Sequence, residues 1–200
     1  AHRVVGAAVG LGAPAQPAVP EDDSVRLVTV AGVTGTVATA LEDTLARFRL
    51  APEADEADEE RELRRAERAA AEVLATEGYF SPRVRFEPNP AGTPRYRLVV
   101  DTGRLTRVTA VEISFRGALA EPAFAERAAA LQKGWGLPVG APFRSADWET
   151  AKNRLLLATT ARDFAAATLA QSSADVDAEA GAAVLRIDVD SGPAYRVGSL

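Results

Sequence analysis

The feature that most constrains this chain is a helix stop followed by two extended runs, because the pattern occurs twice. In the first copy, Glu77-Gly78-Tyr79-Phe80 precedes a run from Ser81 to Pro88, a turn, and a run from Arg95 to Gly103. A weaker copy begins at Asp163-Phe164 and closes at Val189-Asp190-Ser191-Gly192. The copies are offset by 84 positions at the aromatic residue (164 − 80) and by 89 at the closing aspartate (190 − 101). A pattern that recurs at a nearly constant spacing indicates that the repeat is the unit of architecture.

Two repeats in 200 residues predict two small domains, spanning 24–103 and 104–192. Domains of this size can fold around a modest core. Residues 193–200 resemble the start of a first strand, so we expect them to open a third domain. The leading segment 1–23 has no helical period and contains several prolines. It is predicted to be either a disordered linker or the remainder of a secretory signal.

The first repeat predicts the order strand, helix, helix, strand, strand. Val25 to Ala31 is rich in β-branched residues and predicts the first strand. A helix should follow a cap at Thr34 or Thr36, with one apolar face at helical spacing: Val37, Leu41, Leu45 and Phe48. The second helix is predicted from about Ala57 to Glu77, with Asp55 or Asp58 as its cap and Gly78 as its left-handed stop.

Alternation of apolar and polar residues predicts a hairpin after that stop. Arg83 to Glu87 and Arg95 to Asp101 alternate, and Asn89 to Gly92 has the composition of a turn. The second repeat predicts the same order, with strands at 108–115, 168–174 and 184–190, a helix entered through Pro122, and a helix capped by Ser145. The fold class is therefore α+β, as two tandem units in which two helices cover one face of a three-stranded mixed sheet.

This arrangement resembles POTRA domains, the periplasmic modules of the BamA and TamA superfamily of outer-membrane assembly proteins. Gly78-Tyr79-Phe80 before the hairpin and the Asp-x-Gly close at 101–103 carry the resemblance in the first unit. The closing phrase from Asp190 to Gly198, and Leu137 to Gly140 followed by Ser145 to Lys152, are most similar to TamA. The second unit departs from the pattern at Asp163-Phe164, where a glycine and an aromatic residue are usual; aspartate tolerates a left-handed backbone better than most residues.

The resemblance implies a non-catalytic scaffold in the periplasm, belonging to an outer-membrane translocation and assembly factor. Its partners would be nascent outer-membrane proteins, a TamB-like periplasmic protein and a C-terminal β-barrel of the same protein. Two alternatives stay open: the arm of a BamA-like or two-partner secretion transporter, and an α+β protein-binding module unrelated to export.

Strand addition at a sheet edge is the physical route that this resemblance implies for client binding. The strand after the second helix lies at an edge in the POTRA pattern, which gives the candidate binding residues Arg83, Val84, Arg85, Phe86 and Glu87. The equivalent run in the second unit is Thr168 to Ser173.

Several charged or aromatic features have a functional and a structural interpretation. Arg83, Arg85, Arg95 and Arg97 could bind an acidic partner or lipid headgroups, or could be edge charges that discourage aggregation. The acidic run 53–60 lacks the ligand spacing of a calcium loop and fits a solvated helix start. Trp135 could be an exposed contact or a plug over the second core.

The composition argues against catalysis and against nucleic-acid binding. The chain has no cysteine, and its single histidine is His2, so no triad or zinc site can be assembled from these residue types. Its glycines form no phosphate loop and no dinucleotide fingerprint. A net charge of −5 gives no basic footprint for nucleic acid. We therefore expect no enzyme activity and no cofactor.

Overall fold

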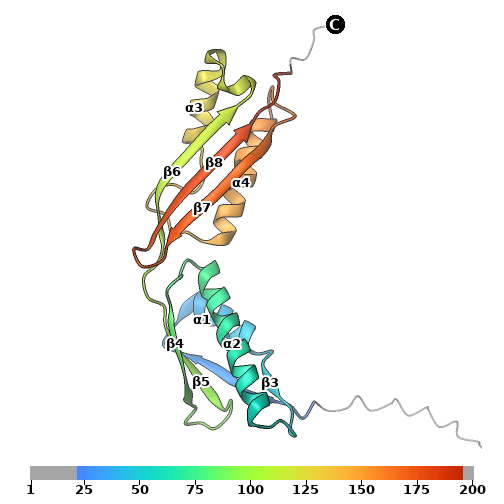
Figure 1. The fold of residues 1–200 in the computed structure, drawn as a ribbon, viewed down its shortest axis with the longest axis vertical. Helices are drawn as coiled ribbons and strands as arrows, with labels where there is room; N and C mark the ends of the chain where they lie inside the picture. Colours follow the sequence, from blue (N-terminus) through green and yellow to red (C-terminus); the bar gives the residue numbers. More distant parts are fainter. Residues whose placement is uncertain (1–21, 196–200) are drawn as a thin grey trace, which may run out of the picture.

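The computed structural model describes residues 22–195 (Figure 1). The predicted leading segment therefore lies outside the described residues except for its last two positions. The predicted third domain lies outside them except for 193–195, which are not in a strand.

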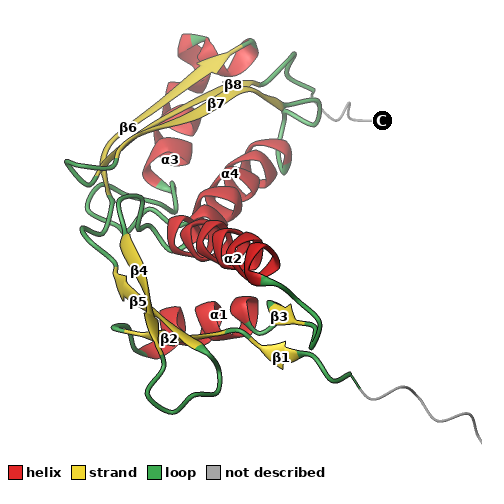
Figure 2. Cartoon of the chain, turned by 60° about the horizontal axis from the view of Figure 1, so that its bottom comes forward, coloured by secondary structure: helices red, strands yellow, loops and turns green. Residues whose placement is uncertain are grey.

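The first unit is built on a three-stranded mixed sheet. Its main elements are β2 (Val28–Ala31), α1 (Gly35–Leu45), α2 (Glu56–Thr76), β4 (Arg83–Pro88) and β5 (Tyr96–Asp101). The strand order is β2-β5-β4, with β2 parallel and β4 antiparallel to β5. Figure 2 shows both helices on one side of this sheet. The predicted order of elements and the α+β class are confirmed.

The predicted first strand is divided in two at Leu27. Residues Val25–Arg26 form β1, which pairs with β3 (Arg49–Leu50) in a separate two-stranded sheet. Leu27 is buried; its N–H donates to the Phe48 carbonyl at 3.0 Å, and its carbonyl accepts from the Tyr96 N–H at 3.0 Å. The chain therefore crosses between sheets at this residue. Strand β3 has only two residues, too few for an alternating pattern to predict it.

Helix α2 begins as its acidic start predicts. Asp55 is the N-cap and forms a capping box with Asp58, so two otherwise unpaired N–H groups are satisfied. Glu60 and Arg64 form an ion pair at 3.3 Å on the exposed side of the helix. The buried side consists of Ala66, Ala69, Ala70 and Leu74. The helix ends as predicted, with Gly78 at φ 96°.

The second unit repeats the plan with longer strands. Its elements are β6 (Arg107–Arg116), two short 3₁₀ turns η1 (Ala118–Ala120) and η2 (Pro122–Phe124), α3 (Ala125–Lys133), α4 (Ser145–Thr160), β7 (Thr168–Asp177) and β8 (Ala182–Asp190). The order is β6-β8-β7, with β6 parallel and β7 antiparallel to β8. Helices α3 and α4 lie on one side of this sheet (Figure 2).

Two details of the second unit differ from the sequence prediction. Ser145 is the first helical residue of α4 and not its cap; the N-cap is Arg144, and no side chain caps this helix end. Pro122 begins a 3₁₀ turn, and the α-helix starts three residues later. The turn at Asp163 keeps the predicted left-handed backbone, with φ 64°, and Phe164 is fully buried.

Candidate binding edges

Strand β4 holds the predicted binding residues along one edge of the first sheet. It pairs with β5 only, from Arg83 opposite Asp101 to Pro88 opposite Tyr96. Val84 and Phe86 are half-buried and pack against the first core, whereas Arg83 and Arg85 are exposed. The exposed side chains therefore lie on one face of the strand, and the apolar ones lie on the other face, which packs against the first core.

One hydrogen bond shows which backbone groups of β4 point away from the sheet. The Asn89 N–H donates to the Arg95 carbonyl at 3.0 Å, so Asn89 faces β5. In an antiparallel pair the facing residues alternate, which places Arg83, Arg85 and Glu87 toward β5 and Val84 and Phe86 outward.

Prolines limit this outward edge at both ends. The same alternation points Pro82 and Pro88 outward, and proline has no N–H to donate. Only the N–H groups of Val84 and Phe86 remain as outward donors between them. An edge bounded in this way can accept a short added strand but resists extended pairing.

Acidic side chains pair with three of the four arginines of the predicted basic strip, which consists of Arg83, Arg85, Arg95 and Arg97. Glu87 pairs with Arg85 at 2.9 Å and with Arg97 at 3.1 Å, and Glu59 pairs with Arg95. The hydrogen bond from Arg85 is the main reason that the pKa of Glu87 lies below its usual value. Pairing of this kind favours the interpretation of the strip as charges that protect an edge.

Other predicted features lie where they serve the fold. The acidic run occupies the start of α2, and the described residues contain no cluster of three or more potential metal ligands. Trp135 is half-buried over the second core, its indole N–H donates to the Leu137 carbonyl at 2.8 Å, and its ring packs edge-on against Trp148. Strand β7, which includes the predicted run Thr168 to Ser173, is an edge of the second sheet. Within residues 22–195 no helix has the length and apolarity needed to cross a membrane.

The segment Gly78-Tyr79-Phe80 contacts both units, a role that the sequence did not predict. Tyr79 packs against the first core, but Phe80 packs against the second and stacks on Phe143, with ring centroids 6.2 Å apart. The Thr106 N–H donates to the Gly78 carbonyl at 2.8 Å. Sequence alone shows that these positions are apolar and does not show which core each one enters.

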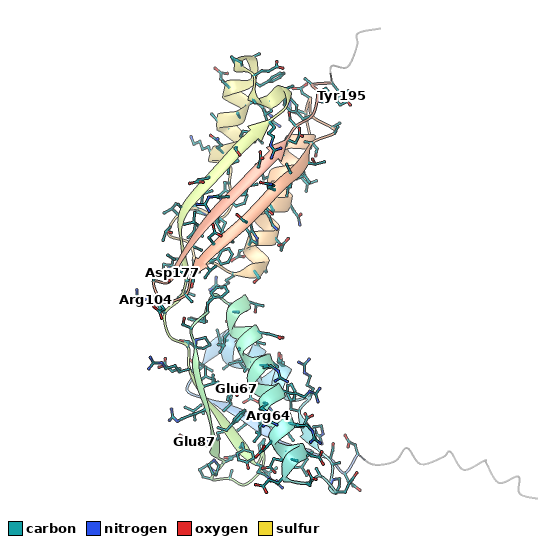
Figure 3. All side chains as sticks on the ribbon, viewed as in Figure 1. Arg64, Glu67, Glu87, Arg104, Asp177 and Tyr195 are labelled. Atoms are coloured by element: carbon teal, nitrogen blue, oxygen red, sulfur yellow. The ribbon has the colours of Figure 1, made fainter. Side chains whose placement is uncertain are left out.

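Arg104, the first residue after the first unit, is held by a contact within the second unit. Figure 3 places Arg104 next to the end of β7, near Asp177. The Arg104 guanidinium donates to the Ala180 carbonyl at 3.2 Å. The link is therefore fixed by the Thr106–Gly78 hydrogen bond between the units and by the anchoring of Arg104 in the second unit.

Comparison with known proteins identifies the class of the first unit. Residues 27–102 match the family model described as POTRA domain, TamA domain 1. The match covers the first unit and agrees with its predicted resemblance to a POTRA domain of the TamA type. No curated protein matches the sequence.

The chain is also similar to several solved structures. Haemophilus influenzae BamA POTRA3-5 is 18% identical, with a TM-score of 0.43, over 89% of this chain and 71% of that one. The N-terminal domain of Omp85 from Thermosynechococcus elongatus is 11% identical, with a TM-score of 0.43, over 88% and 72%. Escherichia coli CdiB is 13% identical, with a TM-score of 0.38, over 88% of this chain but 29% of that one.

Proposed function

We propose that this chain is the periplasmic arm of a TamA-like outer-membrane translocation and assembly factor. The observation that carries the proposal is the match of residues 27–102 to the first POTRA domain of TamA. In this proposal 24–103 and 104–192 are separate domains that act as a non-catalytic scaffold. Nascent outer-membrane proteins or autotransporters would be the clients, and a TamB-like protein would be the periplasmic partner.

Client binding would occur by strand addition at β4. The outward N–H groups of Val84 and Phe86 would pair with carbonyl groups of an extended client segment. The side chains of these two residues already pack in the core, so they contribute nothing to client selection. Main-chain pairing of this kind accepts many sequences, as a general assembly factor requires.

A proline at Val84 tests this mode of binding, because it removes one outward donor and keeps the bonds to β5. We expect Val84→Pro to weaken capture of an unfolded outer-membrane protein by about tenfold, the effect of losing a hydrogen bond of about 1.4 kcal/mol. The measurement is a pull-down or fluorescence titration with the 200-residue chain.

Val84→Ala is the matched control, since it loses the same packing but keeps the N–H. Capture by Val84→Ala should stay close to wild type after both variants are shown to be folded by circular dichroism. Equal capture by wild type and Val84→Pro would rule out β4 as the client edge.

A further inference from the structure

The outer edge of β6 carries backbone groups that no strand of the described chain pairs. The Ser191 N–H donates to the Arg116 carbonyl at 3.0 Å, which places Arg116 toward β8. Alternation along the strand then points Glu112 and Ser114 toward β8 and Val111, Ile113 and Phe115 outward. The Gln132 amide confirms this direction independently, since it donates to the Ile113 carbonyl at 3.0 Å from the outer side.

Only the first part of this edge is covered by backbone. The Val108 N–H donates to the Ala141 carbonyl at 2.9 Å, and the Gly140 N–H donates to the Val108 carbonyl at 2.8 Å. A register shift between Val108 and Ala110 ends this pairing. Beyond it, the Gln132 side chain is the only partner that the described residues supply to the outward groups.

An open groove of about 440 Å³ runs beside these free groups. Val111 and Ile113 line it from the strand, and Trp135 and Val139 line it from the loop after α3. Val139 is 62% exposed and leaves an apolar side chain open to solvent at the groove. Lys133 borders the groove and forms no ion pair with any residue in the described range. The carboxylate of Glu112 also lines the groove, but it pairs with Arg186 at 3.0 Å. The groove therefore combines apolar walls, free main-chain groups and the positive charge of Lys133.

The equivalent edge in the first unit is closed by a stronger contact. Glu42 of α1 accepts from the Val30 N–H at 2.7 Å and from the Thr29 hydroxyl at 2.8 Å, and it pairs with Arg26. Three partners, one of them charged, hold this carboxylate against β2. Gln132 of α3 lies in the same place relative to its own sheet, but it is exposed and makes one neutral hydrogen bond. The two units thus differ in how easily a competing strand could displace the covering side chain.

We propose that the edge of β6 from Val111 to Phe115 binds an extended protein segment as a fourth strand of the second sheet. The added strand would displace Gln132 and pair with the outward groups of Val111, Ile113 and Phe115. Alternate apolar side chains of the segment would enter the groove, and an acidic residue at its end would pair with Lys133. This site is separate from β4 and extends the proposed function by giving the second unit its own specificity, for segments that are apolar at alternate positions and acidic at one end.

The probe is a synthetic peptide, capped at both ends, in which valines alternate with threonines between two terminal aspartates. It is titrated into the ¹⁵N-labelled 200-residue chain while amide shifts are followed residue by residue. We expect the largest shifts at Val111, Ile113, Phe115 and the Trp135 indole. The same peptide with a central proline cannot form the added strand and should cause no shifts there.

Four variants separate strand addition from a general effect on stability. Val111→Pro removes an outward N–H and should weaken peptide binding about tenfold, whereas Val111→Ala keeps it and should stay within about twofold. Gln132→Ala removes the competing side chain and should strengthen binding about threefold. Lys133→Glu should weaken binding of the aspartate peptide and strengthen binding of a peptide with lysines at the same ends.

Each alternative result has a defined meaning. Shifts confined to Val84 and Phe86 would overturn the β6 site and leave the proposed function at β4 intact. Absence of shifts at both edges would overturn both. Sedimentation that shows a wild-type dimer, abolished by Val111→Pro, without peptide shifts at β6 would assign this edge to a second copy of the chain and also overturn the inference.

Discussion

Gly78 lies where the backbones of the two units meet. A Cβ atom there would lie 2.9 Å from the Phe143 carbonyl oxygen and 3.0 Å from a Leu105 methyl group. Its φ of 96° is also outside the range that L residues adopt readily. The sequence predicted the left-handed conformation of this glycine; the close approach from the second unit could not be predicted, because Phe143 lies far along the chain.

We expect Gly78→Ala to lower the free energy of unfolding by about 3 kcal/mol, since backbone strain and a clash add. Gly92→Ala is the matched control: its φ is 79°, but nothing lies within 4 Å of the added Cβ. That variant should cost about 1 kcal/mol. Urea denaturation compares the two, and equal losses would show that the contact with the second unit contributes nothing.

Glu42 makes the stability of the first unit depend on pH. Burial by itself would raise the pKa of this carboxyl, but hydrogen bonds from Val30, Thr29 and Arg26 outweigh it and hold the pKa below the usual 4.5. A lowered pKa in the folded state means that the stabilisation is complete above the unfolded pKa and disappears as pH falls through the folded one.

Glu42→Gln should therefore destabilise the chain by about 1 kcal/mol at pH 7, a value reduced by the partial exposure of the pair. The difference from wild type should shrink progressively below about pH 4.5. Thermal unfolding of both proteins between pH 3 and 7 measures it. A difference that does not change with pH would assign the effect to packing and not to the charge.

At the scale of elements, the two proposed binding strands differ in how their edges are protected. Strand β4 is limited by outward prolines at 82 and 88, and β6 by the 140–141 loop and Gln132. The resemblance to POTRA domains predicted that β4 lies at an edge, because the strand after the second helix does so in that pattern. The direction of individual N–H groups depended on register, which only the paired strands define.

Hydrogen exchange tests this assignment of directions. Amides of Val84, Phe86 and Val111 should exchange quickly, because they point outward, and those of Arg85 and Glu112 should be protected by their ladders. The contrast within each strand is the informative measurement, since global unfolding would expose both sets equally. If the outward amides were protected and the inward amides exchanged quickly, the register described above would be wrong.

For the whole molecule, the junction is a small interface with one aromatic contact at its centre. Phe80 of the first unit stacks on Phe143 of the second, and Glu77 pairs with Arg144 at 3.5 Å beside them. Figure 1 shows a single segment of chain connecting the two sheets. Because this connection is narrow, the contacts of these side chains restrict bending there.

Phe80→Ala should release the two units from each other. We expect about 2 kcal/mol less stability, below the range for a fully buried phenylalanine because Phe80 is half-buried. Small-angle scattering should show a broader range of overall dimensions than wild type. Glu77→Ala is the control and should have little effect, because a partly exposed ion pair of this kind contributes under about 1 kcal/mol. Unchanged scattering in Phe80→Ala would mean that the short link alone sets the arrangement.

The sequence by itself determined the repeated α+β units, the helix faces, the alternating strands and the left-handed turns. These features depend on neighbouring residues, so periodicity and turn composition are sufficient to predict them. Only the tertiary structure decided which core receives Phe80, which backbone groups of β4 and β6 point outward, and that Glu42 closes one edge while Gln132 loosely covers the other. Each of these depends on contacts between residues far apart in the chain, and a local pattern contains no information about such distances.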